Sequence, residues 1–329
     1  MMRTAVLGSN SFSGSHFVEH VLKAEHRVLG ISRSSEVGAE FRPYASNSNI
    51  DKFSFMQASV RFDMSDIEEA LIEFKPDYVV NFAAQSMVGE SWVHPEDWYE
   101  TNVVANATFS NILGKIPSLK KYVHVTTPEV YGSTPDWISE GTQFNPSTPY
   151  AVSRAAGDMH MRIMQRHSGL PVVFTRAANV FGPGQQLYRV IPRAFLSALL
   201  GRPFQLHGGG LSRRSFIHIS DVSRATLILA ESGIPGEDYH ISTRELVTIR
   251  EVVEKAFELA GVQFQADKAA SEDRLGKDAG YFLDSTKLRE ATEWNTLVSL
   301  DEGLKQTFDW VQGNLVTFSK MSWEYVHKS

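Results

Sequence analysis

The sequence contains no cysteine, and this absence excludes several kinds of chemistry at once. Disulfide bonds, thiolate metal sites and a cysteine nucleophile are all ruled out. Long hydrophobic runs are missing as well, since no apolar stretch approaches the roughly 20 residues that a membrane-spanning helix needs. The first residues, MMRTAVLGSNSF, become polar too early for a secretory signal. We therefore expect a soluble, cytoplasmic protein with no membrane partner.

An excess of positive charge is also absent, because 32 Lys and Arg stand against 38 Asp and Glu, a net charge of -6. This balance gives no electrostatic case for nucleic acid as a partner. Four of the histidines, His16, His20, His207 and His218, show no metal-like spacing. We interpret them as structural or surface residues and expect no metal site.

What the sequence does contain is a repeated alternation of β-branched runs and amphipathic stretches, typical of β-α units around a parallel sheet. The predicted strands are RTAVLG, HRVLGIS, DYVVNFAA, KYVHVTT and PVVFTRA. The rhythm changes after about residue 180, where further helices are expected around 189–201, 249–260 and 301–314. The predicted fold class is α/β, a Rossmann-like doubly wound parallel sheet with a smaller C-terminal substrate-binding lobe. We expect residues 1–178 to form the first domain, with part of 215–248 returning to it, and 179–329 to form mainly the lobe.

The stretch VLGSNSFSGSHF follows the first strand and opens a helix. Gly8 and Gly14 occupy the first and third positions of a G-x-x-G-x-x-G turn, and Ser11 takes the middle one. Such a turn brings a helix N-terminus close to a pyrophosphate, which predicts a dinucleotide site. We expect the Ser11 hydroxyl to be able to donate to a phosphate oxygen.

The second strand ends in GISRSS, without the acidic residue that usually accepts hydrogen bonds from the ribose of NAD. Arg33 and the serines around it would favour a 2′-phosphate. The alternative is a solvated arginine in a loop. We therefore expect NADP as the preferred cofactor, with NAD as the other possibility.

Two short stretches carry candidate catalytic groups. TTPEVYG places Thr127 and Glu129 at the end of a strand, where a carboxylate can move a substrate proton. TPYAVSRAAGD places Tyr150 one helical turn before Arg154, so that the cation would favour the phenolate and lower the pKa of the tyrosine. Taken alone, the first stretch is as well explained by an exposed loop glutamate. Taken alone, the second is better explained by a packing tyrosine beside a surface arginine.

These stretches together resemble a known family. NFAAQSMVGESWVHPEDWYETN, TTPEVYG, NPSTPYAVSRAAGD, RAANVFGPGQQ, GGGLSRRSFIHISDV and DRLGKDAGYFLDSTKL occur in the order of the extended short-chain dehydrogenase/reductases. The resemblance runs nearly end to end and is greatest to the nucleotide-sugar 4,6-dehydratases that act on dTDP-glucose or GDP-mannose. It implies a lyase of deoxysugar and polysaccharide biosynthesis, with tightly bound NAD(P) regenerated in each cycle, and a homodimer formed through helices around 98–114 and 150–166.

The resemblance also implies roles for individual residues. Tyr150 would take the proton of the sugar 4-hydroxyl, Thr127 would bond near that hydroxyl, and Glu129 would abstract the C5 proton. Arg154 would replace a lysine at the nicotinamide ribose. Cofactor contacts are expected from Gly8, Ser11, Phe12, Ser13, Gly14, Arg33, Ser34, Ala83, Ala84, Tyr150 and Arg154. Contacts with the nucleotide-diphosphate sugar are expected from Gln85, Ser86, Asn179, Arg193, Arg214 and Arg274.

The chain departs from the family pattern at several of these places. Arg154 replaces lysine, Pro128 replaces an aspartate that can protonate a leaving hydroxyl, and Ser11 replaces the middle glycine. Two alternatives therefore stay open beside the dehydratase. One is a nucleotide-sugar 4-epimerase of the same family, and the other is a catalytically impaired protein that binds NADP or nucleotide sugars.

Overall fold

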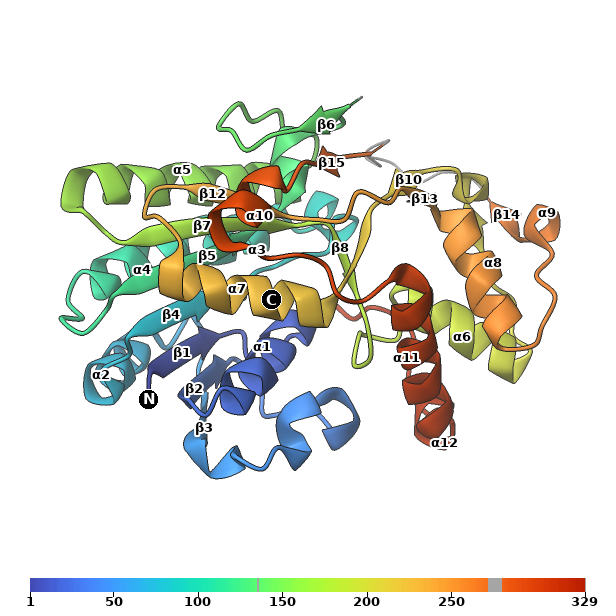
Figure 1. Cartoon of the computed structure of the whole chain (residues 1–329), viewed down its shortest axis with the longest axis horizontal. Helices are drawn as coiled ribbons and strands as arrows, with labels where there is room; N and C mark the ends of the chain where they lie inside the picture. Colours follow the sequence, from blue (N-terminus) through green and yellow to red (C-terminus); the bar gives the residue numbers. More distant parts are fainter. Residues whose placement is uncertain (135, 272–279, 329) are drawn as a thin grey trace.

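The computed structural model describes residues 1–134, 136–271 and 280–328, and its centre is a seven-stranded sheet (Figure 1). The strand order is β12-β7-β5-β4-β1-β2-β3, and neighbouring strands are parallel. The order reverses between β1 and β4, and doubly wound sheets bind ligands at the carboxyl ends of the strands at such a point. The strands are β1 (Arg3–Leu7), β2 (Arg27–Ser32), β3 (Phe53–Gln57), β4 (Tyr78–Asn81), β5 (Lys121–Thr126), β7 (Val172–Ala177) and β12 (Asp238–Ile241).

Helices cover both faces of this sheet. The helices α1 (Phe12–Lys23) and α7 (Ile219–Ser232) pack on one face, and α2 (Met64–Phe74), α4 (Ala105–Leu113) and α5 (Pro149–Ser168) lie on the other (Figure 1). Alternate residues of β1 belong to the two cores: Val6 packs with residues of α1 and α7, whereas Ala5 and Leu7 pack with residues of α2, α4 and α5. Burial on both faces explains why the strands are continuous apolar runs.

A separate hydrophobic core holds the lobe together. It is formed by α6 (Val190–Leu200), α8 (Ile249–Leu259), α11 (Leu300–Gly313) and α12 (Leu315–Phe318), which lie to one side of the sheet in Figure 1. The helix α8 begins with a capping box between Thr248 and Glu251, the local signal that fixes a helix start. The shorter elements are α3 (Pro95–Tyr99), β6 (Trp137–Ile138), β8 (Asn179–Phe181), β9 (Leu206–His207), β10 (Arg213–Arg214), β11 (Phe216–His218), β13 (Val247–Thr248), α9 (Ala266–Ala269), β14 (Ala270–Ser271), β15 (Phe282–Leu283) and α10 (Thr286–Thr292).

The predicted fold class is confirmed, and the differences from the prediction are local. The strand β3 was not predicted, because it is an edge strand whose residues are at most partly buried and lack a continuous apolar run. The predicted strand over 77–84 ends at Asn81, and Phe82–Ala84 continue into the ligand cleft instead. The strand β12 pairs with β7 at the edge of the main sheet. The division into domains stays a prediction.

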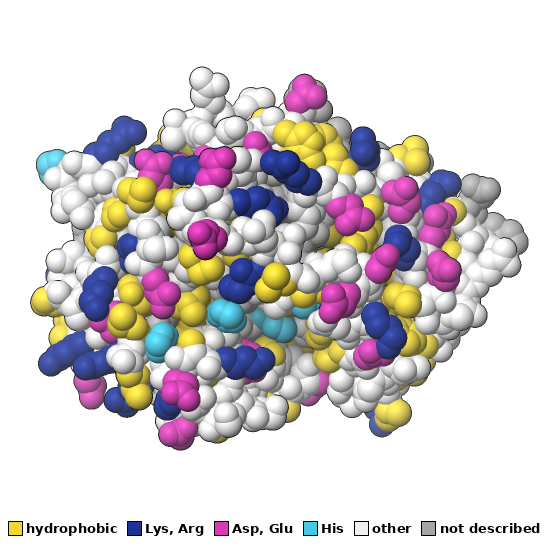
Figure 2. All heavy atoms as spheres, in the orientation of Figure 1, with side chains coloured by type: hydrophobic (Ala, Val, Ile, Leu, Met, Phe, Trp, Pro, Cys, Tyr) yellow, Lys and Arg dark blue, Asp and Glu magenta, His cyan; other side chains and the backbone are white. Residues whose placement is uncertain are grey.

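The surface drawn in Figure 2 mixes charges of both signs. Lys and Arg side chains alternate with Asp and Glu across this face, so the described residues drawn there form no continuous basic stripe. Within the described ranges, no helix combines the length and the apolar character required to cross a membrane. The cytoplasmic location stays a prediction.

Candidate functional site at the carboxyl ends of the strands

The turn between β1 and α1 requires glycine at two places. Gly8 has a φ of +77°, which L side chains rarely adopt, and a Cβ there would lie 2.7 Å from the backbone nitrogen of Ala83. A Cβ on Gly14 would lie 2.2 Å from the carbonyl oxygen of Gly8. Both glycines therefore allow α1 to start against the carboxyl end of β1, where a helix N-terminus favours a phosphate.

Ser11 has a structural role in this turn. Its hydroxyl donates to the carbonyl of Gly8 at 2.7 Å and accepts from the backbone nitrogen of Gly14 at 3.0 Å, so it caps α1. The hydroxyl proton is thus used within the turn in this structure, and the expected hydrogen bond from Ser11 to a phosphate stays a prediction. Ser11 fixes the turn between the two glycines.

A cavity of about 350 Å³ opens beside this turn, and it collects residues from the ends of β1, β2 and β4. Of the predicted ligand-binding residues it includes Gly8, Ser11, Arg33, Ser34, Ala83, Ala84 and Gln85. Phe12, Ser13 and Gly14 form the first turn of α1, with the Phe12 ring buried in the core. Ser86 is exposed and is not part of the cavity wall. The remaining wall includes Gln186, the last residue of the stretch RAANVFGPGQQ, and four residues outside the quoted motifs, namely Tyr188, Tyr325, Val326 and Lys328.

Asn10 is a further residue of this wall that the sequence did not single out. Its side-chain amide donates to the carbonyls of Ser34 at 2.8 Å and Ser35 at 2.9 Å, which ties the glycine turn to the end of β2. Its Oδ1 is buried and has no partner among the described residues. A buried acceptor of this kind is costly unless a ligand donates to it, so the wall fits a cofactor with hydroxyl or amino donors.

Tyr150 lies at the start of α5 and is the centre of a second group of residues. Thr148 caps this helix and Pro149 takes its first position, so the local sequence fixes where the tyrosine points. Tyr150 is 8% exposed and its hydroxyl hydrogen-bonds with the side chain of Thr127, at the end of β5. Glu129 follows in a 3₁₀ turn, Pro128–Tyr131, close enough for its charge to act on Tyr150. The four predicted catalytic residues are thus neighbours.

The pKa of Tyr150 is raised overall. Burial raises the pKa of this phenol, and the negative charge of Glu129 adds to that rise. Arg154 and the hydrogen bond from Thr127 oppose the rise without cancelling it. The expected lowering of the pKa by Arg154 is present, but desolvation outweighs this cation one helical turn away, so the overall shift is upward.

Arg154 itself is 5% exposed, and its guanidinium donates through Nη2 to the backbone carbonyl of Val125 on β5. Its Nε is buried without a partner in the described part of the chain. A buried guanidinium nitrogen without an acceptor is costly, and a ribose hydroxyl would be a suitable acceptor. This arginine thus combines a structural contact with one donor that is still available.

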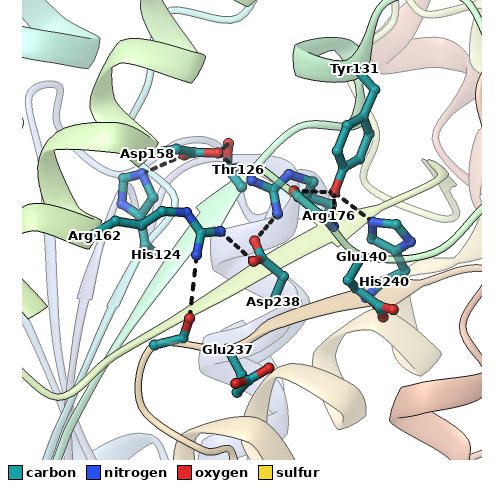
Figure 3. A network of polar contacts seen from close by, with 12 residues as sticks. His124, Thr126, Tyr131, Glu140, Asp158, Arg162, Arg176, Glu237, Asp238 and His240 are labelled. Atoms are coloured by element: carbon teal, nitrogen blue, oxygen red, sulfur yellow. Dashed lines mark hydrogen bonds and ion pairs between the residues drawn. The ribbon is translucent and has the colours of Figure 1, made fainter. Parts of the chain in front are cut away.

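Behind Tyr150, helix α5 is held to the sheet by a network of buried charges (Figure 3). Asp158 of α5 contacts Arg176 of β7 at 2.6 Å, His124 of β5 at 3.2 Å and Thr126 at 3.1 Å. Arg176 also pairs with Asp238 of β12, which in turn pairs with Arg162 of α5. Burial acts to raise the pKa of Asp158, but Arg176 and His124 outweigh it and hold the pKa at about 2.

Three other predicted substrate residues, Asn179, Arg193 and Arg214, come after the sheet strand β7 in the chain, and none of them lines the cavity. Asn179 lies on β8, where it pairs with Phe216 of β11. Arg214 of β10 is buried, donates to the carbonyl of Arg213 at 2.9 Å and lies 5.2 Å from the ring of Tyr281. Arg193 is bound to Glu324 at 2.9 Å. Arg274 falls outside the described residues.

The glycine turn, the cleft at the reversal of strand order and the group around Tyr150 define an extended short-chain dehydrogenase/reductase. The sequence model of a family described as GDP-mannose 4,6 dehydratase matches residues 6–307, and the chain belongs to this family. The chain is 32% identical over 333 residues to a probable dTDP-glucose 4,6-dehydratase of Sinorhizobium fredii, covering 95% of this chain and 93% of the relative.

Solved structures agree with this placement. DesIV, a dTDP-glucose 4,6-dehydratase from Streptomyces venezuelae with NAD bound, gives a TM-score of 0.87 at 29% identity, over 96% of this chain and 98% of that one. A UDP-glucose 4-epimerase from Thermotoga maritima with UDP-glucose gives 0.86 at 26% identity, over 95% and 100%. The predicted family and enzyme class, a nucleotide-sugar 4,6-dehydratase, are confirmed. The related structure supports NAD as the cofactor, and the predicted preference for NADP has no such support.

Proposed function

We propose that this protein converts an NDP-hexose into an NDP-4-keto-6-deoxyhexose and water, with dTDP-glucose as the first substrate to test. The observation that carries the proposal is the convergence of Tyr150, Thr127 and Glu129 at the carboxyl end of β5. A phenol and a carboxylate on neighbouring positions can serve two different protons of one sugar ring. The names of the relatives, dTDP-glucose 4,6-dehydratases, support the choice of hexose and nucleotide.

In this proposal Tyr150 accepts the proton of the 4-hydroxyl while Thr127 holds that hydroxyl in place. The chemistry that bound NAD would supply is reversible hydride transfer, away from C4 of the sugar and later back to C6. The resulting 4-keto group makes the C5 proton acidic, and Glu129 removes it as the C6 hydroxyl leaves as water. Pro128 has no proton to give to the leaving C6 hydroxyl. Glu129, the next residue in the chain, would instead pass the proton taken from C5 to that hydroxyl. The proton that Tyr150 took from the 4-hydroxyl balances the proton that C5 gains at the end, and no cofactor is consumed.

The cofactor would be held by the glycine turn and Asn10, which line the cavity, and by Arg154, which lies outside the cavity wall beside Tyr150. The glycine turn and the start of α1 would receive the pyrophosphate, and Asn10 Oδ1 would accept from a cofactor hydroxyl or amino group. Arg154 Nε would donate to the nicotinamide ribose, which gives the arginine the position that a lysine holds in related enzymes. Both atoms are buried and have no protein partner within the described ranges, which supports this assignment.

A 4-epimerase is the second candidate, because the Thermotoga maritima epimerase resembles this chain almost as closely as DesIV does. An epimerase needs Tyr150 but no base at C5, so Glu129 distinguishes the two. The test is incubation with dTDP-, UDP-, GDP- and CDP-hexoses, followed by mass spectrometry of the sugar nucleotide. Loss of one water from the product supports dehydration, whereas unchanged mass with altered stereochemistry supports epimerisation. No turnover of any hexose despite cofactor binding would point to a binding protein.

We further propose that two copies of the chain associate through α5. Val152, Met159 and Ile163 of this helix are exposed, by 40%, 52% and 62%, and they share one side of the helix because they are spaced by seven and four residues. Val104, on the π-helical turn before α4, is 59% exposed. Ile163→Glu should convert the dimer into a monomer in size-exclusion chromatography with light scattering. A wild-type monomer would refute the proposal.

A further inference from the structure

The last described residues, 322–328, form a segment that runs back from α12 to the ligand cleft; we call it the closing segment. It is anchored at its start by Trp323, which is buried, donates through Nε1 to the carbonyl of Phe318 at 2.9 Å and lies under the guanidinium of Arg202 at 4.4 Å. From this anchor the chain reaches the cavity, and Tyr325, Val326 and Lys328 form part of its wall. The cavity wall therefore combines residues near the ends of β1, β2 and β4 with residues of the closing segment.

The closing segment crosses the cleft instead of lying along its rim. The carbonyl of Lys328 accepts from Arg33 Nη1 at 2.8 Å and from Gln85 Nε2 at 2.7 Å. Arg33 follows β2 and Gln85 follows β4, and β1 lies between these two strands in the sheet. The two donors to this carbonyl thus lie on either side of β1. The closing segment therefore crosses the carboxyl end of β1, where the glycine turn begins.

A histidine holds the segment on the β4 side. His327 Nε2 lies 2.8 Å from Asp97 Oδ2, and its ring stacks on those of His94 and Trp98 with centroid separations of 5.4 and 5.1 Å. Asp97 is buried on α3 and is also bound by Arg61 Nη1 at 2.7 Å. The hydrogen bond from His327, together with Arg61, lowers the pKa of Asp97 against the effect of burial.

The remaining contacts of the segment are weak enough to open. The pair of Arg193 and Glu324 is exposed on both sides, and such pairs contribute little. Tyr325 meets the ring of Tyr188 edge-on at 5.4 Å, and Val326 is 67% exposed. Local opening of a segment held by a few polar contacts costs far less than global unfolding.

We infer that the closing segment is a gate on cofactor exchange, which shuts across the dinucleotide cleft when His327 docks on Asp97 and Trp98. The inference rests on the proposed binding of NAD in this cleft. An enzyme that regenerates its dinucleotide in every cycle needs no exchange, and a gate retains the cofactor between cycles. Arg33 and Gln85, expected from the sequence to contact ligands, hold the gate in place through its backbone.

The test measures the release of NADH from the protein without any sugar. Protein loaded with NADH is mixed in a stopped-flow instrument with excess NAD, and the loss of the protein-enhanced NADH fluorescence gives the dissociation rate. Two variants open the gate: His327→Ala, and a chain that ends after Glu324 and so keeps Trp323. Lys320→Ala, an exposed change just before the segment, is the matched control. Thermal unfolding verifies that each variant is folded.

We expect His327→Ala to release NADH about tenfold faster, the equivalent of ~1.4 kcal/mol, and the shortened chain to release it faster still. Association should accelerate in both variants, and the control should match the wild type. Wild-type rates in folded variants would overturn the inference. A faster association of NADH with an unchanged dissociation rate would also overturn the inference. The segment would then compete with the cofactor for the cleft and would not retain bound cofactor. Failure of the wild type to bind NADH would refute the proposed cofactor and the gate together, whereas bound NADH without sugar turnover would refute only the reaction.

Discussion

Arg154 lies one helical turn after Tyr150 on α5, yet its guanidinium reaches across to the backbone carbonyl of Val125 on β5. The arginine therefore ties the catalytic helix to the strand that carries Thr127, while its charge still acts on the phenol. A lysine has only one side-chain nitrogen. It could not bond to the Val125 carbonyl and also offer a second nitrogen near Tyr150. The site is built around arginine.

Replacement of Arg154 should separate its two effects. Arg154→Met removes the charge that opposes the rise in the pKa of Tyr150, so that pKa should rise further. We expect kcat at neutral pH to fall at least about tenfold, since one pKa unit corresponds to ~1.4 kcal/mol, and the ascending limb of the pH profile to move to higher pH. The measurement is the pH dependence of kcat for the 4-keto product.

Arg154→Lys is the matched variant, because it keeps the positive charge and loses the several N–H donors of the guanidinium. It should lower kcat a few-fold, through the lost contact with Val125, and leave the pH profile where it is. A rate well above that of the wild type would show that arginine impairs the site and would contradict our interpretation.

Glu129 provides the test that is specific for elimination. Glu129→Gln removes the base for C5 but leaves Tyr150 and Thr127 in place, so oxidation at C4 should continue without loss of water. With dTDP-glucose we expect absorbance of bound NADH to accumulate while the yield of the dehydrated product falls by about 100-fold or more. Glu69→Gln, an exposed change on α2 that lies outside the cavity wall, is the control. Normal dehydration by Glu129→Gln would refute the assignment of the C5 base.

The sequence was sufficient to predict the layers of the fold, because strands buried on both faces and amphipathic helices carry periodic signals. It also predicted the group around Tyr150, since Thr127 and Glu129 are fixed by a strand end and Tyr150 by a capped helix start. The sequence did not predict the closing segment. The contact from Lys328 is made by a backbone carbonyl, which leaves no trace in residue type, and its partners Arg33 and Gln85 are about 240 residues or more away in the chain. The overall rise in the Tyr150 pKa was not predicted for a related reason, since burial depends on the packed structure.

Cofactor preference follows from what Arg33 contacts. Its Nη1 donates to the carbonyl of Lys328, which gives this arginine a role that needs no 2′-phosphate. We expect fluorescence titration to show tighter binding of NADH than of NADPH. Arg33→Ala should change the affinity for NADPH by less than about threefold, whereas loss of a charge-assisted phosphate contact would cost tenfold or more. A large and selective loss of NADPH binding would restore the original interpretation of Arg33.

The network behind α5 should contribute strongly to stability. Asp158→Asn leaves Arg176 buried with only Asp238 to balance it, and breaking a buried pair from one side costs about 3–5 kcal/mol. Urea unfolding should show this loss in the free energy of unfolding. Asp309→Asn breaks the exposed pair with Lys305 and should cost under about 1 kcal/mol. Equal effects of the two substitutions would contradict a structural role of the network.

Stability should also fall as the pH drops below neutrality, because one partly buried and two buried histidines are held neutral. Burial lowers the pKa of His16 and of His218 to about 4, and burial followed by the charge of Arg176 lowers that of His240 to about 3. The unfolded chain takes up protons at these positions below about pH 6.5, whereas the folded chain does not. Each histidine therefore contributes stability that is present above pH 6.5 and is lost towards pH 4, at about 1.4 kcal/mol per pH unit.

His240→Gln tests this origin of acid sensitivity. Glutamine can still bond with Tyr131, the partner of His240 Nε2 at 3.0 Å, but it takes up no proton in the unfolded chain. The free energy of unfolding, measured in urea between pH 6.5 and pH 4.5, should decline less steeply by about 1.4 kcal/mol per pH unit. The exposed His167 provides the control, since it faces water in both states and His167→Gln should leave the slope unchanged. An unchanged slope in His240→Gln would place the acid sensitivity elsewhere, and an increased slope would mean that the buried imidazole is charged in the folded protein.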